Sequence, residues 1–426
     1  MMVLTGILFY YLIAVFWIRR ATKNDPTALS TLQIALALGF KIALGCLYGY
    51  IFLIKYDGDD TWLLHQFSLE QHELLRSDPL KFFSEMNPVA AFDRYDDLQT
   101  NIYYYLSDLE AWFFGKPFAF INFLSGGNYY VNIVFFNAFV FWGHYWLYKL
   151  LISRFSIPSL PLFVSIFFIP PVIFWLSGLR AEGPLLFFIS LLLYHYERLL
   201  KKPGFSSVLL VLISFAGIII LRSSILFILI PALLSWLLVV RKKTRPLLAF
   251  AAVYGFCGTV FFGSSILFPE KGLTSLVVNR QKEFFELEGN TRFHLDTLSG
   301  NGLSFAKVFP QALNNVFLRP YPWEAKGALQ YGAVLEVMLF LVLLLMFVHK
   351  KIPGWKSILN DPLILLFLSF AFCLYMLTGY TVPFPGAIVR YKITGELFLL
   401  ISLVVCIDWN ALLKKGRTVT LNKNKI

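Results

Sequence analysis

Long apolar runs alternate with short polar connections along the chain. A helix crosses the bilayer in about 20 residues, so runs of this length predict membrane-spanning helices. The pattern predicts an all-α, polytopic transmembrane protein with a single membrane domain over 1–426 and about eleven spans. The predicted spans are 3–18, 31–54, 131–150, 159–176, 184–196, 206–221, 224–240, 246–267, 328–348, 362–378 and 393–408.

Basic residues gather in alternate connections, as the positive-inside rule produces at cytoplasmic loops. The first run lacks a basic residue before it and a small-residue cleavage site after it, which indicates a retained helix. The N-terminus is therefore predicted outside and the C-terminus in the cytoplasm. The basic clusters are Arg19/Arg20/Lys23, Lys149/Arg154, Arg198/Lys201/Lys202, Arg241/Lys242/Lys243/Arg245, Lys350/Lys351/Lys356 and Lys414/Lys415/Arg417/Lys423/Lys425.

Composition strengthens the membrane interpretation. Of 426 residues, 58% are hydrophobic and 15% charged, which excludes a soluble enzyme, a disordered chain and a fibrous repeat. The net charge of +12 lies in short clusters between apolar runs, so it does not indicate nucleic acid as a partner. All 4 cysteines lie inside apolar runs, and neither a disulfide framework nor a thiolate metal site is indicated.

The connections predicted on the outer face are unequal. Two are long, 55–130 and 268–327, and the first holds 12 of the 25 acidic residues against 5 basic ones. Within it, 64–75 and 98–114 place apolar residues at spacings of three and four. They are interpreted either as interfacial helices lying on the membrane surface or as ordinary amphipathic helices of a small outer domain.

An acidic motif, YDGDDTW, follows the second predicted span. Asp57, Asp59 and Asp60 lie within four residues around Gly58, and like charges this close repel unless a cation or substrate offsets them. The motif is a candidate general base or a site for a divalent metal such as Mg²⁺ or Mn²⁺, with Asp59, Asp60 and His65 as ligands. The alternative is a solvated acidic turn in which Asp60 or Thr61 caps the next helix.

Ionisable residues also stand at the tips of two apolar hairpins. Arg180 and Glu182 lie in a short connection, where Arg180 can bind a phosphate and Glu182 can act as a base or orient a ligand. The alternative is an ion pair that fixes the hairpin. Arg222 stands alone between apolar runs and is interpreted as an anion contact or as a side chain that reaches the lipid headgroups.

The segment LRPYPWEAKG precedes the ninth predicted span. Its two prolines predict an extended backbone, and its alternating aromatic and charged groups suit sugar or acceptor binding. An interfacial aromatic anchor is the alternative, and Trp323 taken alone favours it. The candidate sugar contacts are Arg319, Tyr321, Trp323 and Glu324.

The last predicted span begins with PFPGAIVRYKITGE. Arg390 and Lys392 are predicted on the outer side, where the positive-inside rule does not explain basic residues. Binding of a polyanionic headgroup explains them better. Lys41 and Glu336 fall within apolar spans and are predicted as buried polar contacts between helices.

Together these motifs predict one outer pocket with a carboxylate side and a cationic side. Such a pocket suits attack by a hydroxyl on a sugar whose leaving group is a lipid phosphate. The pattern resembles the GT-C class of polytopic glycosyltransferases, which have a large first outer loop and an acidic motif after an early helix. Asp57, Asp59 and Asp60 match that motif and Glu182 a second acidic position. Here, however, the motif follows the second predicted span rather than the first.

The resemblance implies transfer of a sugar from a polyprenyl-phosphate donor to a lipid-linked or cell-envelope glycan acceptor, in a bacterial inner membrane. Bacterial polysaccharide and O-antigen polymerases or ligases look similar too, and Arg180, Arg222 and Arg390 fit their lipid-diphosphate contacts equally well. A transporter or flippase is a third interpretation, although that class favours repeated halves and polar groups near the bilayer midplane.

Overall fold

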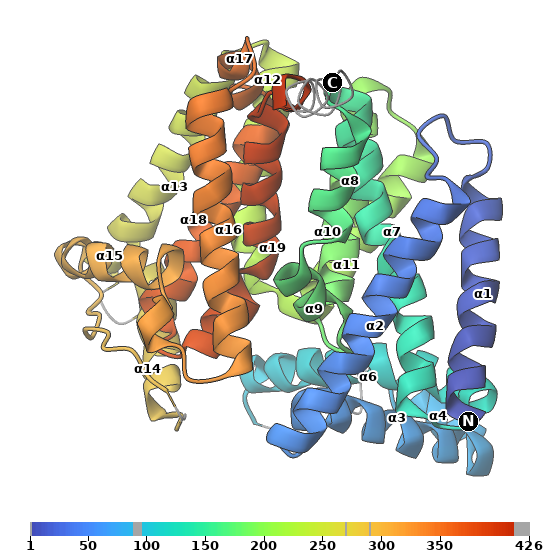
Figure 1. The fold of residues 1–426 in the computed structure, drawn as a ribbon. Helices are drawn as coiled ribbons and strands as arrows, with labels where there is room; N and C mark the ends of the chain where they lie inside the picture. Colours follow the sequence, from blue (N-terminus) through green and yellow to red (C-terminus); the bar gives the residue numbers. More distant parts are fainter. Residues whose placement is uncertain (1, 88–95, 269–270, 289–290, 413–426) are drawn as a thin grey trace, which may run out of the picture. The chain divides into compact units, whose positions relative to one another are not determined.

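The computed structural model describes residues 2–87, 96–268, 271–288 and 291–412 (Figure 1). The described residues are mostly helical, and their only β pairing is an isolated bridge between Lys351 and Ile407. The basic tail predicted in the cytoplasm lies outside the described residues, as do short pieces of both predicted outer loops.

Among the residues that the structure describes, seven helices are long and apolar enough to cross a membrane, which makes the chain an integral multi-pass membrane protein. An eighth span results if α8 (Ser159–Phe167) and α9 (Pro170–Ser177), bent by 49°, are taken together. The seven are α1 (Met2–Thr22), α2 (Thr31–Lys55), α11 (Phe205–Arg222), α12 (Ser224–Lys242), α13 (Pro246–Leu267), α16 (Ala328–Lys350) and α18 (Pro362–Thr381).

The other predicted spans are helical but more polar. They form α7 (Tyr129–Arg154), α10 (Glu182–Lys201) and α19 (Pro385–Cys406). The predicted count of eleven spans and the predicted orientation stay predictions. The run 159–176, expected as one span, is instead broken between α8 and α9, because Pro170 suits a helix start and not a helix interior.

The helices form two compact units, and the single membrane domain stays a prediction. Unit 1 comprises Met1–Arg154 and Ile173–Ser223, and unit 2 comprises Phe155–Val172 and Ser224–Ile426. In unit 1, α7 packs against α1, α2 and α10 and is therefore the central helix. It buries polar side chains such as Asn137 and His144 as well as apolar ones.

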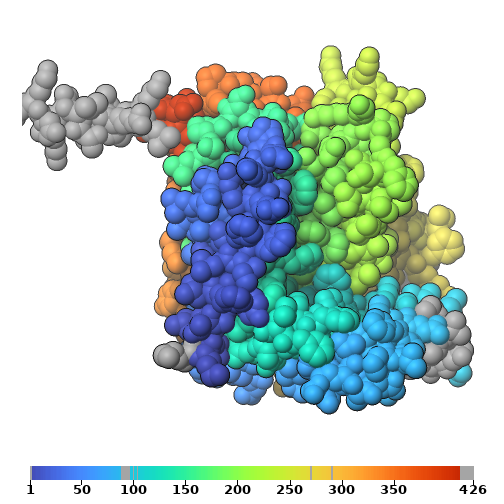
Figure 2. Space-filling view, turned by 90° about the vertical axis from the view of Figure 1, so that its right-hand side faces the viewer, coloured from blue at the N-terminus to red at the C-terminus, as the bar shows by residue number. Residues whose placement is uncertain are grey.

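Three helices of the first long connection lie across one end of α1 and α2 within unit 1 (Figures 1 and 2). They are α3 (Asp59–Ser77), α4 (Pro79–Ser84) and α6 (Leu98–Ser125), and α3 runs along α6. Asn122 of α6 donates to the Ser68 carbonyl on α3 and accepts from Asn132 on α7, which ties this layer to the central helix. The two segments predicted as amphipathic helices are thus helical, and their placement at the lipid headgroups stays a prediction.

Unit 2 is built around α18 and α19. The rings of Phe367 and Phe398 stack between these helices, with centroids 4.2 Å apart, and α15 and α12 pack on α18 while α16 and α8 pack on α19. The shorter elements are α14 (Leu273–Glu286), α15 (Gly302–Phe317), the 3₁₀ turn η1 (Pro322–Glu324) and α17 (Trp355–Leu359).

Candidate functional site

The acidic motif forms a tight left-handed turn between α2 and α3. The φ angles are 51° at Asp57, 97° at Gly58 and 45° at Asp59. Gly58 is needed here, because a Cβ at this φ would lie 2.7 Å from the Cβ of Trp62. Helix α3 begins at Asp59 after Gly58 and has no side-chain cap, so the alternative in which Asp60 or Thr61 caps the helix is wrong.

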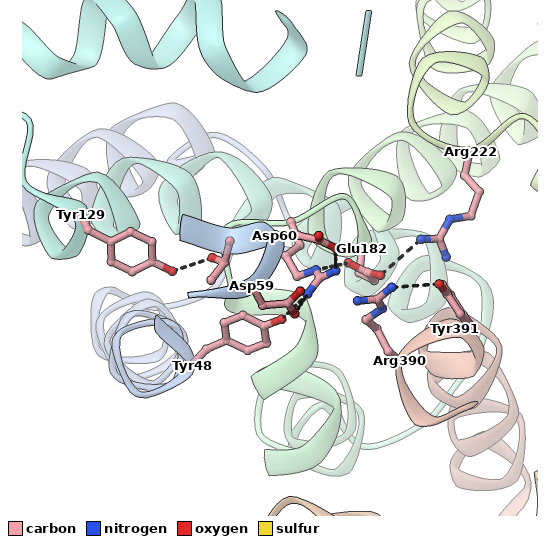
Figure 3. A network of polar contacts seen from close by, with 10 residues as sticks. Tyr48, Asp59, Asp60, Tyr129, Glu182, Arg222, Arg390 and Tyr391 are labelled. Atoms are coloured by element: carbon pink, nitrogen blue, oxygen red, sulfur yellow. Dashed lines mark hydrogen bonds and ion pairs between the residues drawn. The ribbon is translucent and has the colours of Figure 1, made fainter. Parts of the chain in front are cut away.

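Arg180 lies in the α9–α10 connection and binds the first turn of α3 through Asp59 and Asp60, which are drawn in Figure 3. Its guanidinium donates to Asp59 Oδ2 at 2.8 Å and to Asp60 Oδ2, and also to the Tyr48 hydroxyl at 3.1 Å. The arginine side chain is 5% exposed, against 33% for Asp59 and 56% for Asp60. Asp57 is exposed in the turn, and Arg180 pairs with the other two aspartates instead.

Charge neighbours keep Arg180 ionised despite its burial. Burial alone would lower the pKa of the guanidinium, but Tyr48, Glu182 and the two aspartates raise its pKa above the usual value. Arg180 is therefore a fixed cation that orients carboxylates. Its predicted role as a phosphate contact stays a prediction, and in this structure its Nη1 and Nη2 groups are bound to the two aspartates.

Two buried polar residues hold the connection that carries Arg180. Lys41 of α2 is fully buried and donates to Ser177 Oγ at 3.1 Å, and Asn137 donates to the Ser177 carbonyl at 3.0 Å. Gly45 lets this backbone approach α2, since a Cβ there would lie 2.5 Å from the Ser177 oxygen. The prediction that Lys41 is a buried contact between helices is confirmed.

Glu182 and Arg222 extend the network on the next two helices. Glu182 begins α10 and is buried, and its Oε1 accepts from Arg222 Nη2 at 3.3 Å, while its Oε2 lies 3.9 Å from Arg180 Nε (Figure 3). Arg222 ends α11 and is 24% exposed. Within unit 1 a chain of ion pairs thus links α3, the α9–α10 connection, α10 and α11; its members are Asp59, Asp60, Arg180, Glu182 and Arg222.

Glu110 of α6 is a member of this region that the sequence did not indicate. Burial raises the pKa of its carboxyl; Arg222 and Arg180 lower the pKa, and Glu182 and Asp60 raise it. Glu110 therefore lies within electrostatic reach of both arginines, Glu182 and Asp60. Its spacing in an amphipathic segment gave no signal, because only the packing of α6 against α11 brings it there.

The predicted metal ligands do not form a metal site. Among the residues that the structure describes, no three His, Cys, Asp or Glu side chains are grouped to hold a metal ion. Arg180 occupies the position between Asp59 and Asp60 that a cation would take. His65 is buried edge-on against Trp62 and Tyr129, and burial lowers its pKa to about 4. The donor set therefore does not fit Mg²⁺ or Mn²⁺.

Arg390 and Lys392 belong to unit 2 and differ from each other. Arg390 is partly buried and donates to the Tyr391 hydroxyl at 2.9 Å (Figure 3). Lys392 is 2% exposed and pairs with Glu336 and Glu396, so its predicted place as a phosphate contact at the outer rim is corrected to a buried ion cluster. The two residues diverge because positions two apart on a helix face different directions.

The predicted sugar-binding segment is a compact turn. Pro322–Glu324 form η1 where an extended strand was expected, because Glu324 reaches back to the Tyr321 backbone N–H at 3.0 Å and to Arg319 at 2.6 Å. Tyr321 and Trp323 stack with centroids 4.9 Å apart, and Trp323 is 79% exposed. This aromatic pair, in which Trp323 is the exposed ring, is compatible with a sugar platform and with an interfacial anchor.

Comparisons of the sequence with protein-family models, and with curated proteins and solved structures, gave no match.

The arrangement in unit 1 is chemically asymmetric. Carboxylates outnumber guanidinium groups, and the most exposed member is Asp60, whose carboxyl is fixed by a buried arginine. A fixed, water-accessible carboxylate at the end of membrane helices is suited to accept a proton from a hydroxyl. Arg222, the more exposed arginine, is suited to stabilise a nearby developing negative charge.

Proposed function

We propose that the chain is a membrane glycosyltransferase that moves a sugar from a polyprenyl-phosphate donor to a lipid-linked or cell-envelope glycan acceptor on the outer face. The observation that carries the proposal is the pair Asp59 and Asp60, fixed by the buried Arg180 at an end of the membrane helices that remains open to solvent. The proposed location is the bacterial inner membrane.

The proposed reaction is a single displacement. The oxygen of an acceptor hydroxyl attacks the anomeric carbon of the donor sugar, and the bond from that carbon to the phosphate oxygen breaks. Asp60 takes the hydroxyl proton, because it is the most exposed carboxylate of the cluster. Polyprenyl phosphate leaves with the bonding electrons, and Arg222 stabilises its charge. Asp59 and Glu182 position the two arginines.

Orientation of unit 1 supports the outer face. The Asp59–Asp60 cluster lies where α2 ends and α10 begins, whereas the opposite ends of these helices carry the basic residues. There Lys149 pairs with Asp25 and Arg154 pairs with Glu197. By the positive-inside rule the basic end faces the cytoplasm, and the carboxylate cluster then faces outward.

A polymerase or ligase in which arginines bind a lipid diphosphate is less well supported. That chemistry needs guanidinium groups turned toward the substrate, whereas Arg180 is buried and bound to two aspartates. A transporter is also less well supported, because the unit 1 cluster lies at a helix end and not near the middle of the spans.

The test is turnover of labelled polyprenyl-phosphate sugars by the purified protein, with lipid-linked glycans as acceptors. We expect Asp60→Asn to lower turnover by about 100-fold or more, because the amide accepts no proton. Asp59→Asn should lower it less, since Asp59 positions Arg180. Equal turnover by the parent and both variants would remove these carboxylates from the mechanism.

Asp57→Asn is the matched control. Asp57 lies two residues before Asp59 in the same turn and is exposed, so the substitution makes the same change in charge and shape. We expect it to keep turnover within about threefold of the parent, because substitutions of exposed residues usually have small effects. Comparable losses in Asp57→Asn and Asp60→Asn would indicate a general effect of negative charge and would contradict a specific base.

A further inference from the structure

Unit 2 contains a second charged cluster, buried between α16, α18 and α19. Lys392 Nζ lies 3.1 Å from Glu336 Oε1 and 3.3 Å from Glu396 Oε2. The side chains of Lys392, Glu336 and Glu396 are 2%, 0% and 3% exposed. Tyr375 of α18 donates its hydroxyl to Glu396 Oε2. Ionisable groups buried at such a place in a membrane protein are costly and by default indicate a function.

The two glutamates are not equivalent. Glu396 accepts from the Tyr375 hydroxyl and contacts the ammonium of Lys392, so two donors stabilise its charge. Glu336 has the ammonium on one oxygen, while its Oε2 has no hydrogen-bond partner among the residues that the structure describes. The gap beside the cluster, lined by Phe317, Phe340 and their neighbours, is too narrow to hold a water molecule.

The charges of the cluster do not balance. Two carboxylates face one ammonium, and Lys392 also donates to the backbone carbonyl of Val316 on α15, which carries no charge. Electrostatic interactions link Glu336, Tyr375 and Lys392 to one another and to Glu396. With both glutamates ionised, a net negative charge would be buried, which is energetically unfavourable. A neutral carboxyl costs much less to bury.

We propose that Glu336 binds one exchangeable proton, so that this intramembrane cluster of Glu336, Lys392 and Glu396 is a neutral proton-binding site. The ligand is a proton and not a metal cation, because the ammonium of Lys392 already contacts both carboxylates and no three His, Cys, Asp or Glu side chains of the described residues are grouped to hold a metal ion. Since α16 packs on α19 at this site, release of the proton places an unbalanced charge between the two helices. Proton occupancy thereby controls how firmly α16 is held.

The proposal is tested by infrared spectroscopy of the purified protein, which resolves the C=O stretch of a protonated carboxyl. At neutral pH we expect Glu336→Gln to lose the band of one protonated carboxyl relative to the parent. Glu396→Gln should lose the same band, because one carboxylate then balances Lys392 and no proton is needed. A band that remains in Glu336→Gln would overturn the assignment of the proton.

Glu396→Gln separates charge balance from burial. If burial alone protonated Glu336, the band would persist in this variant, and the shared-charge proposal would be contradicted. The matched control is Glu324→Gln, which makes the same change in unit 2 at a glutamate paired with Arg319 at 2.6 Å and 22% exposed. It should leave the band unchanged. None of these measurements depends on the proposed transferase activity.

Discussion

The Asp59–Asp60 cluster of unit 1 and the Lys392 cluster of unit 2 differ in their access to water. In unit 1, Arg180 is buried but its partners Asp59 and Asp60 are 33% and 56% exposed. In unit 2, Lys392 and both of its glutamate partners are at most 3% exposed. Similar ionic groups are therefore arranged as an open network in one unit and as a closed one in the other.

This difference separates two kinds of chemistry. An open network exchanges ligands and protons with its surroundings, and its unpaired charge is screened by water. A closed network exchanges only what fits between packed side chains, and each of its charges must be compensated within the protein. Substitutions that remove one charge from each cluster measure this contrast directly.

The largest effect is expected for Lys392→Gln. It removes the cation that faces two buried carboxylates and should lower the free energy of unfolding by about 3–5 kcal/mol. Denaturant titration of the purified protein in detergent measures the loss. Lys201→Gln, at a lysine 70% exposed and paired with Glu197, should change stability by about 1 kcal/mol or less. Equal losses in the two variants would show that the unit 2 cluster is not closed.

Arg180→Gln should cost less, about 1–3 kcal/mol, because water can solvate Asp59 and Asp60 after the guanidinium is removed. Glu182, which is buried, accounts for most of the expected loss, and it keeps Arg222 as a partner. The same denaturant titration gives the value. A loss larger than that of Lys392→Gln would reverse the comparison of the two clusters.

The buried His65 makes the stability of unit 1 depend on pH. Its folded pKa of about 4 lies below the ordinary value of 6.5, so the unfolded chain binds a proton that the folded chain does not. Stability attributable to His65 is present above pH 6.5 and is lost as the pH falls toward 4. At pH 5.5 the loss is about 1 kcal/mol. Unfolding measured at pH 7.5 and 5.5 should show a smaller decrease in His65→Phe than in the parent.

The smallest effect is expected for Glu110→Gln. The raised pKa of Glu110 keeps its carboxyl neutral to higher pH, and its ionisation then adds negative charge near Arg222. Affinity for a phosphate-bearing donor should therefore fall as the pH rises through that pKa. The variant should lack this fall and bind the donor severalfold more tightly at high pH, a difference of about 1 kcal/mol. Donor KM measured across pH tests it, and parallel profiles would exclude Glu110 from the site.

The sequence predicted which regions are helical better than it predicted which residues pair with one another. Apolar runs report local burial, and each predicted run lies in a helix except 159–176, which is a broken pair, and 393–408, which extends two residues beyond the end of α19. It also predicted Asp59, Asp60, Arg180, Glu182 and Arg222 as candidates, because charge at the tip of an apolar hairpin is a local signal. The pairing of these groups depends on contacts between residues far apart in sequence, such as Arg180 and Asp59. Spacing along the chain does not predict such contacts.

For Lys392, two spacings in the sequence favoured different partners, and the prediction followed the wrong one. Its separation of two from Arg390 suggested a shared cationic rim, whereas its separation of four from Glu396 places those two on one helix face. Helical periodicity therefore favours the Glu396 pairing that the structure has. Glu336 comes from another helix, and no periodicity within α19 could predict it.

The turn between α2 and the two aspartates is short, so the position of α2 determines the position of their carboxylates. Only Tyr56, Asp57 and Gly58 separate Lys55 from Asp59, so the height of Asp59 above the bilayer follows the length and tilt of α2. With 25 residues, α2 is about 37 Å long, which exceeds the hydrocarbon core of about 30 Å. A thinner or thicker bilayer changes the tilt of such a helix. Transfer in vesicles should therefore depend on acyl-chain length, with an optimum set by hydrophobic matching.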